Sequence, residues 1–411
     1  MNPAYTGQGR LQVTVTTESR VVPISGATVR ISDPADTSVR LELTTDSSGQ
    51  TQAVELPTPP AADSINKGDS KPYASYSVTV LAEGFETLHI GGVQLLPDGL
   101  AVQPAALSPA RSGGFNVRNL YIAPHTLWGD FPPKIPEADV KPLPDPGGLV
   151  VLPEPVIPEY IIVHLGKPDD EGAPNEWVLF RDYIKNVACS EIYATWATET
   201  IKANVLAIIS FTLNRVYTEW YRGKGYDFTI TNSTAYDQSF VPGRTIFEQI
   251  SVVVDDLFNT YITREGAGQP LLTQYCDGRR TQCDGLSQWG SQALGEQGWD
   301  AISILRRYYG SDIYLAPAEK VEGVPMSFGG TTLSLGSAGE DVRTIQLQLN
   351  RIRENFPALP AVRADGVYGE ETEEAVRTFQ SIFHMPQTGE VDFATWYSIS
   401  NIYVAVAKLA A

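Results

Sequence analysis

Proline residues are concentrated between positions 108 and 158, and they divide the chain. Proline fixes one backbone dihedral and has no amide hydrogen, so such a stretch forms neither a long helix nor a central strand. We expect an extended, polyproline-like and exposed linker or pro-region, which is a natural protease target. A spacer that no protease cuts is the alternative. The prolines concerned are Pro124, Pro132, Pro133, Pro136, Pro142, Pro144, Pro146, Pro153, Pro155 and Pro158.

The chain is too long for one ordinary core. A length of 411 residues indicates roughly two to four domains. The pattern changes along the chain predict four regions: 1–107, 108–158, 159–318 and 330–411. Together they predict a multidomain α+β protein.

The first region has the pattern of a β-sandwich. Leu11, Val13 and Val15 alternate with polar residues, which is the spacing of half-buried strands. Residues 22–29 and 76–85 resemble parts of carboxypeptidase-regulatory-like modules. This resemblance implies an accessory domain and says nothing of catalysis.

The region 159–318 mixes predicted strands and helices, and residues 181–215 are its central stretch. Apolar residues recur there at three- and four-residue steps, which predicts a long buried helix from about Trp196 with Thr195 as its N-cap. Glu191 would lie just before that helix. A carboxyl group between apolar neighbours and a helix N-terminus suits a general acid/base. A capping or surface glutamate is the alternative.

The last region has the pattern of a compact helical domain. Val342, Ile345 and Leu349 form one apolar stripe, and two further stripes follow it. Residues 365–369 form a tight turn between the first two helices. We therefore expect a three-helix domain within 330–411.

Charge and hydropathy exclude some partners. The net charge is −18 and the pI is near 4.7, whereas nucleic-acid binding draws on clustered lysine and arginine. No uncharged apolar run reaches the roughly 18 residues that span a bilayer. The N-terminal segment lacks the basic-then-apolar pattern of a secretory signal. We expect no nucleic acid, no membrane span, and action or delivery without an ordinary signal peptide.

The cysteines and histidines argue against a metal site. An odd count of three cysteines is not a pure disulfide framework, although Cys276 and Cys283 either pair or help to bind a metal. No histidine lies between residues 165 and 383, so a zinc site there would need all three cysteines and a carboxylate. We expect no metal and no other cofactor.

The region 333–400 resembles the peptidoglycan-binding repeat domain of cell-wall hydrolases. The resemblance implies peptidoglycan as a partner. It also implies a groove beside the turn, with Asp365, Tyr368 and Gln380 as candidate contacts to the glycan or stem peptide. The match rests on Gly339, Val342, Ile345, Gln346, Leu349, Asp365, Gly366, Val367, Tyr368, Gly369, Thr372, Ala375, Val376, Phe379, Gln380, Thr388, Gly389 and Val391.

Residues 180–312 resemble the SpoIID family of lytic transglycosylases. The family has a glutamate, a tryptophan five residues later and a lysine eleven residues later. The counterparts here are Glu191, Trp196 and Lys202. The chain departs from the family at Ile209, where an arginine is frequent, and at Cys283, near which zinc-binding members have histidine. The family's closing motif is matched by Ser287, Gln288, Trp289 and Gly290.

This resemblance implies the roles of individual residues. Glu191 would be the single acid/base that cleaves the MurNAc–GlcNAc bond and leaves a 1,6-anhydro-MurNAc end, without metal or nucleophile. Lys202 would reach an acetyl or carboxylate group of the substrate, or be an exposed helix residue. Trp289 would stack on a sugar ring or pack in the core. The other candidate substrate contacts are Ser287, Gln288, Tyr236 and Gln238.

The order of the regions resembles the SleC-like spore cortex-lytic enzymes. That resemblance implies a precursor stored in the cortex and coat region of the spore, which a subtilisin-like germination protease activates. Its substrate would be cortical peptidoglycan. The alternatives are a non-catalytic wall-binding or coat protein and a phage-associated cell-wall hydrolase. An amidase would need zinc-binding histidines that the middle region lacks.

Overall fold

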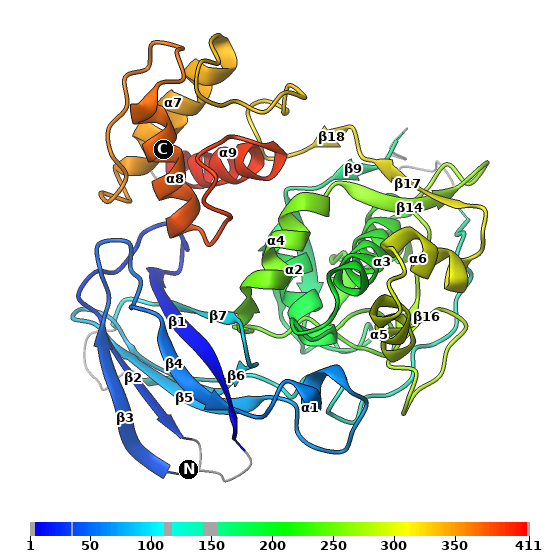
Figure 1. The fold of residues 1–411 in the computed structure, drawn as a ribbon. Helices are drawn as coiled ribbons and strands as arrows, with labels where there is room; N and C mark the ends of the chain where they lie inside the picture. Colours follow the sequence, from blue (N-terminus) through cyan, green and yellow to red (C-terminus); the bar gives the residue numbers. More distant parts are fainter. Residues whose placement is uncertain (1–4, 34–35, 111–116, 143–153, 409–411) are drawn as a thin grey trace.

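The structure is a computed structural model that describes residues 5–33, 36–110, 117–142 and 154–408. Within these residues the chain is mixed α+β. Figure 1 shows an N-terminal β domain, a middle domain built around the helix α3, and a C-terminal helical domain. Pro144, Pro146 and Pro153 lie outside the described residues. Among the described residues, no helix combines the length and apolar character needed to cross a membrane.

The N-terminal β domain consists of two sheets, with strand orders β13-β7-β1-β4 and β3-β2-β5-β6-β8. The alternation expected from the sequence is present, because Leu11, Val13 and Val15 are all fully buried. A short helix, α1 (Ala62–Ile65), follows β4. The strands are β1 (Gly7–Thr17), β2 (Thr28–Asp33), β3 (Asp36–Thr44), β4 (Val54–Thr58), β5 (Ala74–Leu81), β6 (Thr87–Leu95), β7 (Leu100–Leu107), β8 (Val117–Tyr121) and β13 (Ile246–Phe247).

Two strands of these sheets come from outside residues 1–107. β8 extends one sheet by parallel pairing with β6. β13 belongs to the middle of the chain, and it pairs antiparallel with β7 through Ile246 opposite Val102 and Phe247 opposite Ala101. The β domain and the middle domain therefore share a hydrogen-bonded sheet.

The described part of the proline-rich segment is extended and, as expected, exposed at many positions, among them Pro132, Pro133 and Pro136. Residues 122–142, which we call the strap, lie along the middle domain. Ile135 N donates to the carbonyl oxygen of Ala235 (2.7 Å), and Gln274 Nε2 donates to the carbonyl oxygen of Ile135 (2.8 Å). The strap is not a free linker, however, because prolines lack only the backbone amide donor. Their carbonyls and the residues between them still bond and pack.

The middle domain surrounds the long helix α3 (Thr198–Tyr217), which packs against α2, α4, α5, α6 and β14. The middle domain also contains a three-stranded sheet in the order β11-β10-β12. The remaining elements are α2 (Phe180–Glu191), α4 (Glu248–Leu257), α5 (Gln288–Glu296), α6 (Ala301–Tyr309), the 3-10 helix η1 (Arg222–Lys224), β9 (Val156–Ile157), β10 (Tyr160–His164), β11 (Asn175–Leu179), β12 (Ile230–Thr231), β14 (Thr260–Arg264), β15 (Tyr275–Cys276), β16 (Leu286–Ser287), β17 (Ile313–Pro317) and β18 (Lys320–Val321).

The start of α3 differs from the prediction. Its N-cap is Ala197, and Thr195 instead donates its hydroxyl to Ser64 Oγ of the β domain (2.9 Å). Glu191 does not lie just before α3, because it ends α2 and a short connection follows. The predicted break near Glu191 is present, and α3 begins two residues after the predicted Trp196.

The C-terminal domain contains α7 (Glu340–Arg353), α8 (Glu370–Ile382) and α9 (Phe393–Lys408). The turn before α8 is stabilised by Asp365, whose Oδ1 accepts from Val367 N (3.0 Å). The domain contacts both others: Gln50 Nε2 donates to the carbonyl oxygen of Ile382 (2.6 Å), and Arg181 Nη1 donates to Ser398 Oγ (3.1 Å).

Candidate active site

Glu191 lies in the wall of a cavity, although its side chain is almost wholly enclosed. Four groups donate hydrogen bonds to its carboxylate. Thr126 Oγ1 (3.0 Å) and Gln288 Nε2 (3.3 Å) reach Oε2, while Ser239 N (3.1 Å) and the Tyr275 hydroxyl (3.4 Å) reach Oε1. The donors come from the strap, from α5, from a loop and from β15, so the fold as a whole orients this carboxylate.

The cavity has a volume of about 300 Å³, at the lower end of ligand-binding sites. The strap forms one wall, and the loop after β15 forms the opposite one. Its lining residues are Thr126, Gly129, Asp130, Phe131, Pro132, Pro133, Lys134, Glu191, Thr234, Tyr275, Cys276, Asp277, Arg280, Thr281 and Gln288. A lining that combines polar, cationic and aromatic side chains with the carboxylates of Asp130, Glu191 and Asp277 suits a sugar better than a purely apolar ligand.

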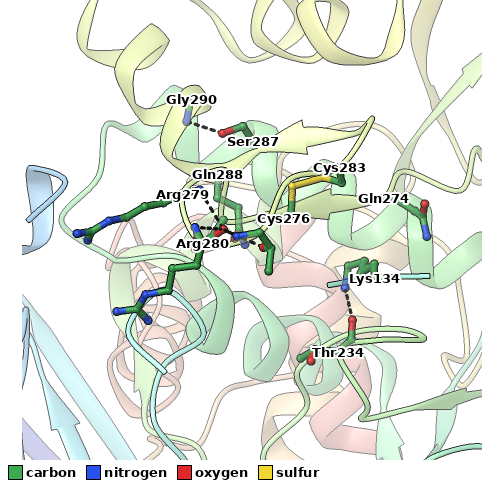
Figure 2. The surroundings of a disulfide bond; sticks show 12 residues. Lys134, Thr234, Gln274, Cys276, Arg279, Arg280, Cys283, Ser287, Gln288 and Gly290 are labelled. Carbon is green, nitrogen blue, oxygen red and sulfur yellow. Dashed lines mark hydrogen bonds between the residues drawn. A yellow bond between two sulfur atoms is a disulfide. The ribbon is translucent and has the colours of Figure 1, made fainter. Parts of the chain in front are cut away.

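Lys134 of the strap is a cation in the lining of this cavity. Its Nζ lies 4.6 Å from the centroid of the Tyr275 ring and donates to the carbonyl oxygens of Asp237 and Thr234, the latter at 3.4 Å. Burial lowers the pKa of Lys134, although the charges of Glu191 and Asp237 act in the opposite direction. Figure 2 shows Lys134 pointing to Thr234, below the disulfide loop.

The loop after β15 is closed by a disulfide bond between Cys276 and Cys283, which answers the question that the sequence left open. Inside the loop the Asp277 carboxylate accepts from the backbone amides of Arg279 (3.0 Å) and Thr281 (2.8 Å). Burial raises the pKa of Asp277, but these amide bonds outweigh it and lower the pKa overall. Asp277 therefore shapes the cavity wall.

Arg280 of the same loop holds the strap. Its Nη1 donates to the carbonyl oxygens of Trp128 and Gly129, the latter at 2.8 Å, and approaches Asp130 at 3.8 Å. Figure 2 places Arg279 and Arg280 on the side of the loop away from Gln274. The strap is thus clamped to the loop that faces Glu191.

A buried ionic cluster fixes the strap beyond the cavity. Arg215 of α3 is fully buried; its Nε pairs with Asp237 Oδ1 (2.8 Å), and its Nη2 pairs with Glu137 Oε1 of the strap (2.6 Å). Lys141 Nζ also reaches Glu137 at 2.7 Å. Asp237 Oδ2 accepts in addition from the Tyr221 hydroxyl (2.7 Å). These charges compensate one another, and they join the strap to the core.

The closing motif expected from the sequence has three different roles. Gln288 contacts Glu191 twice, because its Nε2 also donates to the Glu191 carbonyl oxygen (2.9 Å). Ser287 is the N-cap of α5, and its hydroxyl accepts from Gly290 N (3.0 Å). Trp289 is buried, with its ring 5.1 Å from that of Trp196. Gln288 alone of the three lines the cavity, so substrate contact by Ser287 and Trp289 is not supported.

The other predicted substrate contacts lie elsewhere. Lys202 is partly exposed on the first turn of α3 and pairs with Glu199 (2.7 Å). Gln238 is fully buried, and its Oε1 accepts from Tyr183 (3.1 Å) and Thr212 (2.8 Å). Tyr236 contributes its carbonyl oxygen to Arg215. A buried amide with internal partners is a structural residue, so substrate contact by Gln238 is not supported. Lys202 and Tyr236 do not line the cavity of Glu191, and their roles stay predictions.

Two of the three predicted wall-binding residues are core residues. Tyr368 is 1% exposed and donates its hydroxyl to the carbonyl oxygen of Gly389 (2.7 Å). Gln380 is fully buried; its Oε1 accepts from Gly389 N (2.8 Å). Asp365 is exposed but is occupied in its own turn. Spacing alone did not distinguish a polar residue that holds a loop from one that holds a ligand.

Several cavity residues were missed by the sequence analysis. Thr126 and Lys134 lie in a segment interpreted as a linker, while Tyr275 and Arg280 flank cysteines whose pairing was open. Arg244 was also missed. It is buried, and its guanidinium has no hydrogen-bond partner among the described residues. Burial lowers the pKa of Arg244 to about 10. Only Tyr275 and Arg280 carried a signal in the sequence, because they lie close to Cys276 and Cys283.

The metal-ligating groups of the described residues are dispersed, and no three of them are placed to hold a metal ion. The third cysteine, Cys189, is buried on α2, where its Sγ accepts from Phe247 N (3.3 Å). Burial raises the pKa of the Cys189 thiol to about 12. Its chemistry is that of a core residue.

Comparison with known proteins defines the C-terminal region. Residues 338–399 match the family model described as "Putative peptidoglycan binding domain". A peptidoglycan-binding domain therefore lies near the C-terminus, and peptidoglycan is the partner that it supports. This gives the chain a cell-wall-associated role.

Among individual proteins, the similarities are partial. The SleB N-terminal domain is 29% identical with a TM-score of 0.16, over 18% of this chain and 93% of that chain. The minor pilin GBS52 of Streptococcus agalactiae is 12% identical (TM-score 0.19; 28% and 50% covered), and catechol 1,2-dioxygenase of Pseudomonas arvilla C-1 is 14% identical (TM-score 0.19; 29% and 57% covered). TM-scores this low do not establish a shared architecture. No curated protein matches the chain.

Proposed function

We propose that this protein cleaves peptidoglycan glycan strands by lytic transglycosylation, with Glu191 as the only acid/base. The observation that carries the proposal is the position of Glu191. Its carboxylate lies in a cavity wall, and four donors from separate parts of the fold orient it. Preorganised hydrogen bonds of this kind hold a group in the geometry that a proton transfer needs.

The reaction needs two proton transfers by the same group. The protonated carboxyl of Glu191 donates to the glycosidic oxygen between MurNAc and GlcNAc as the bond to C1 breaks. The carboxylate then accepts the proton of the MurNAc O6 hydroxyl, and O6 closes onto C1 to form the 1,6-anhydro ring. The glutamate ends protonated, ready for another cycle, and no water enters. Gln288 and the Ser239 amide hold the carboxylate in place during both steps.

The strap supports the proposal that the chain is a precursor. Thr126 donates a hydrogen bond to one carboxylate oxygen of Glu191. Arg280 and Arg215 hold the strap in place on either side of the cavity. A subtilisin-like protease that cuts in the proline-rich region would free this wall. We place the protein in the cortex and coat region of a spore, acting on cortical peptidoglycan in germination.

The proposal is tested on purified cortex with the full chain, before and after limited digestion by subtilisin. We expect dye release from labelled cortex mainly after digestion, and mass spectrometry should find anhydro-muramic ends. Glu191→Gln should reduce turnover by about 10³-fold or more, because the amide cannot carry the proton. Glu296→Gln, at the exposed end of α5, is the matched control. Reducing ends in the products, or an active Glu191→Gln enzyme, would refute the mechanism.

A second candidate is a wall-binding protein without catalysis. The match of residues 338–399 favours it, because that domain accounts for attachment without any chemistry. The same dye-release assay separates the two functions. A binder sediments with cortex and releases no dye, whether digested or not.

A further inference from the structure

The outward face of the three-stranded sheet in the middle domain is aromatic. Side chains alternate along a strand, so Ile161 and Val163 of β10 point into the core while Tyr160 and Ile162 point outward. Trp177 of β11 lies opposite Ile162 and shares that face. It is 66% exposed, the ring of Tyr160 is 6.2 Å away, and the two rings meet edge to face. A solvent-facing sheet surface normally carries polar residues, so this one invites a ligand.

A groove of about 580 Å³ lies along this face. Its lining includes a cluster of three rings, Tyr221, Tyr226 and Phe228, which meet edge to face or tilted with centroids 4.9–5.9 Å apart. Tyr226 is 36% exposed, so its ring is open to the groove. The volume lies within the range of about 300–1,000 Å³ typical of ligand sites. Aromatic rings therefore line the groove.

The rim of the groove is mainly acidic. Glu159, Glu219, Asp227 and Glu322 line it. Three of them are paired with partly exposed cations: Glu159 with Lys408, Glu219 with Arg222 and Glu322 with Lys320. Carboxylates are hydrogen-bond acceptors with several free lone pairs, and each can accept from hydroxyl or amide groups of a ligand.

We propose that this groove is a second glycan-binding site, which takes a neutral, N-acetylated saccharide chain. The apolar faces of sugar rings fit on Trp177, Tyr160 and Tyr226, and the sugar hydroxyls and acetamido groups donate to the acidic rim. The proposal does not depend on catalysis by Glu191, because it concerns a separate cavity with its own lining.

Charge favours a saccharide over a second copy of the chain. Two molecules that each carry a net charge of −18 repel one another, and the groove adds acidic groups at the point of contact. An acidic peptide meets the same repulsion. A neutral glycan meets none, and it satisfies both the rings and the carboxylates.

The groove adjoins the peptidoglycan-binding domain. Lys408, at the end of α9, pairs with Glu159 (2.5 Å) and lies 5.6 Å from the centroid of the Tyr160 ring. A glycan chain seated on Tyr160 therefore lies beside the C-terminal domain. The two sites can hold neighbouring parts of one strand, which raises their effective concentration for each other.

The test uses the full chain with Glu191→Gln, so that no cleavage occurs, labelled with 5-fluorotryptophan. The chain has seven tryptophans, and Trp177→Phe and Trp299→Phe assign two of their fluorine resonances. Titration with tetra-N-acetylchitotetraose should shift the Trp177 resonance with a dissociation constant of about 1 mM or below. Trp299, which is 39% exposed but outside the groove, is the matched control and should not shift.

Variants separate the groove from other sites. Tyr226→Ala and Tyr160→Ala should each weaken the Trp177 response by about tenfold. Both side chains are partly exposed, and thermal denaturation checks that the variants fold. A Trp177 resonance that is unmoved by the saccharide overturns the proposal, as does one that shifts with protein concentration alone, which would indicate a second copy. If the wild-type protein proved to have no catalytic activity, this binding result would still stand, because the titration uses a chain with Glu191→Gln.

Discussion

Two of the buried carboxylates of the middle domain, those of Asp237 and Glu191, have partners that differ in kind. Asp237 pairs with the guanidinium of Arg215 at 2.8 Å, and both side chains are fully buried. Glu191 receives its hydrogen bonds from hydroxyl and amide groups, and it belongs to no ion pair within the described residues. One carboxylate is neutralised by a cation and the other by dipoles.

The difference separates a structural charge from one that can take part in chemistry. An ion pair needs both charges, so protonating Asp237 would leave Arg215 short of a partner. The hydroxyls of Thr126 and Tyr275 can donate to a carboxylate or turn to accept from a carboxylic acid. The proposed acid/base role of Glu191 rests on this difference, because its partners are hydroxyl and amide groups that carry no charge.

The largest expected effect on stability is at Asp237. Asp237→Asn should destabilise the protein by about 3–5 kcal/mol, because it removes one of the two carboxylates that compensate buried Arg215. Glu191→Gln should change stability by no more than about 1 kcal/mol, since neutral donors surround it. Denaturant unfolding measures both. Equal losses in the two variants would break the comparison.

The next effect concerns the disulfide beside Glu191. The double variant Cys276→Ser/Cys283→Ser should lose about 2–3 kcal/mol of stability, because the cross-link restricts the unfolded chain. It should also weaken substrate binding, since the loop carries Asp277 and Arg280 of the cavity wall. Reduction of the wild type should reproduce the loss and leave the double variant unchanged. A loss that reduction does not reproduce would point to the serines themselves.

The strap gives a smaller, pH-dependent effect. Burial raises the pKa of Glu137, but Arg215 and Lys141 outweigh it and lower the pKa overall. A lowered folded-state pKa means that the contribution of Glu137 to stability is complete above the unfolded value of about 4.3, and is lost as the pH falls further. We expect proteolysis of the strap to become faster below about pH 4.3.

Glu137→Gln should remove that pH dependence and cost about 1–3 kcal/mol at neutral pH. Glu322→Gln, which changes a partly exposed glutamate paired only with Lys320 at 3.5 Å, is the control and should behave as the wild type. Timed digestion followed by N-terminal sequencing measures both variants. A strap whose cleavage rate is the same from pH 7 to pH 4 would show that the ionic cluster does not hold it.

The smallest effect is expected at Lys202. Its pair with Glu199 is partly exposed, and such pairs contribute about 1 kcal/mol or less. Lys202→Ala should lower the free energy of unfolding by about 1 kcal/mol or less, and it should leave turnover within about twofold of the wild type. A large loss of turnover would return Lys202 to the substrate site, as the family resemblance implied.

Local patterns predicted the elements of the fold better than the contacts between them. The alternation of Leu11, Val13 and Val15 and the apolar steps of α3 are fixed within a few residues, and both are present. The bond from Thr126 to Glu191 joins residues 65 positions apart, and that from Glu137 to Arg215 spans 78. Local periodicity in a sequence does not predict contacts between residues so far apart. The sequence analysis therefore did not predict that the strap forms a wall of the cavity.

The candidate site could be predicted only in part, because its contacts also join residues that lie far apart in the sequence. Glu191 and Gln288 were identified through the resemblance to the lytic transglycosylase family, and the structure brings them into contact. Tyr368 and Gln380 were identified through the resemblance to the peptidoglycan-binding domain, but their polar atoms bond to Gly389 in the interior of the domain. A sequence shows that a residue is polar. Whether its hydrogen bonds are satisfied inside the protein depends on packing that only the folded chain reveals.

The strand β13 has a consequence for any cut made in the proline-rich region. Because Ile246 and Phe247 complete a sheet of the N-terminal β domain, severing the peptide backbone after β8 leaves that sheet intact. The indole of Trp196 also donates to the carbonyl oxygen of Ser64 (2.9 Å), across the same boundary. The two pieces would stay associated and would elute together in size-exclusion chromatography. Cleavage in the proline-rich region would therefore release the strap without releasing the N-terminal β domain.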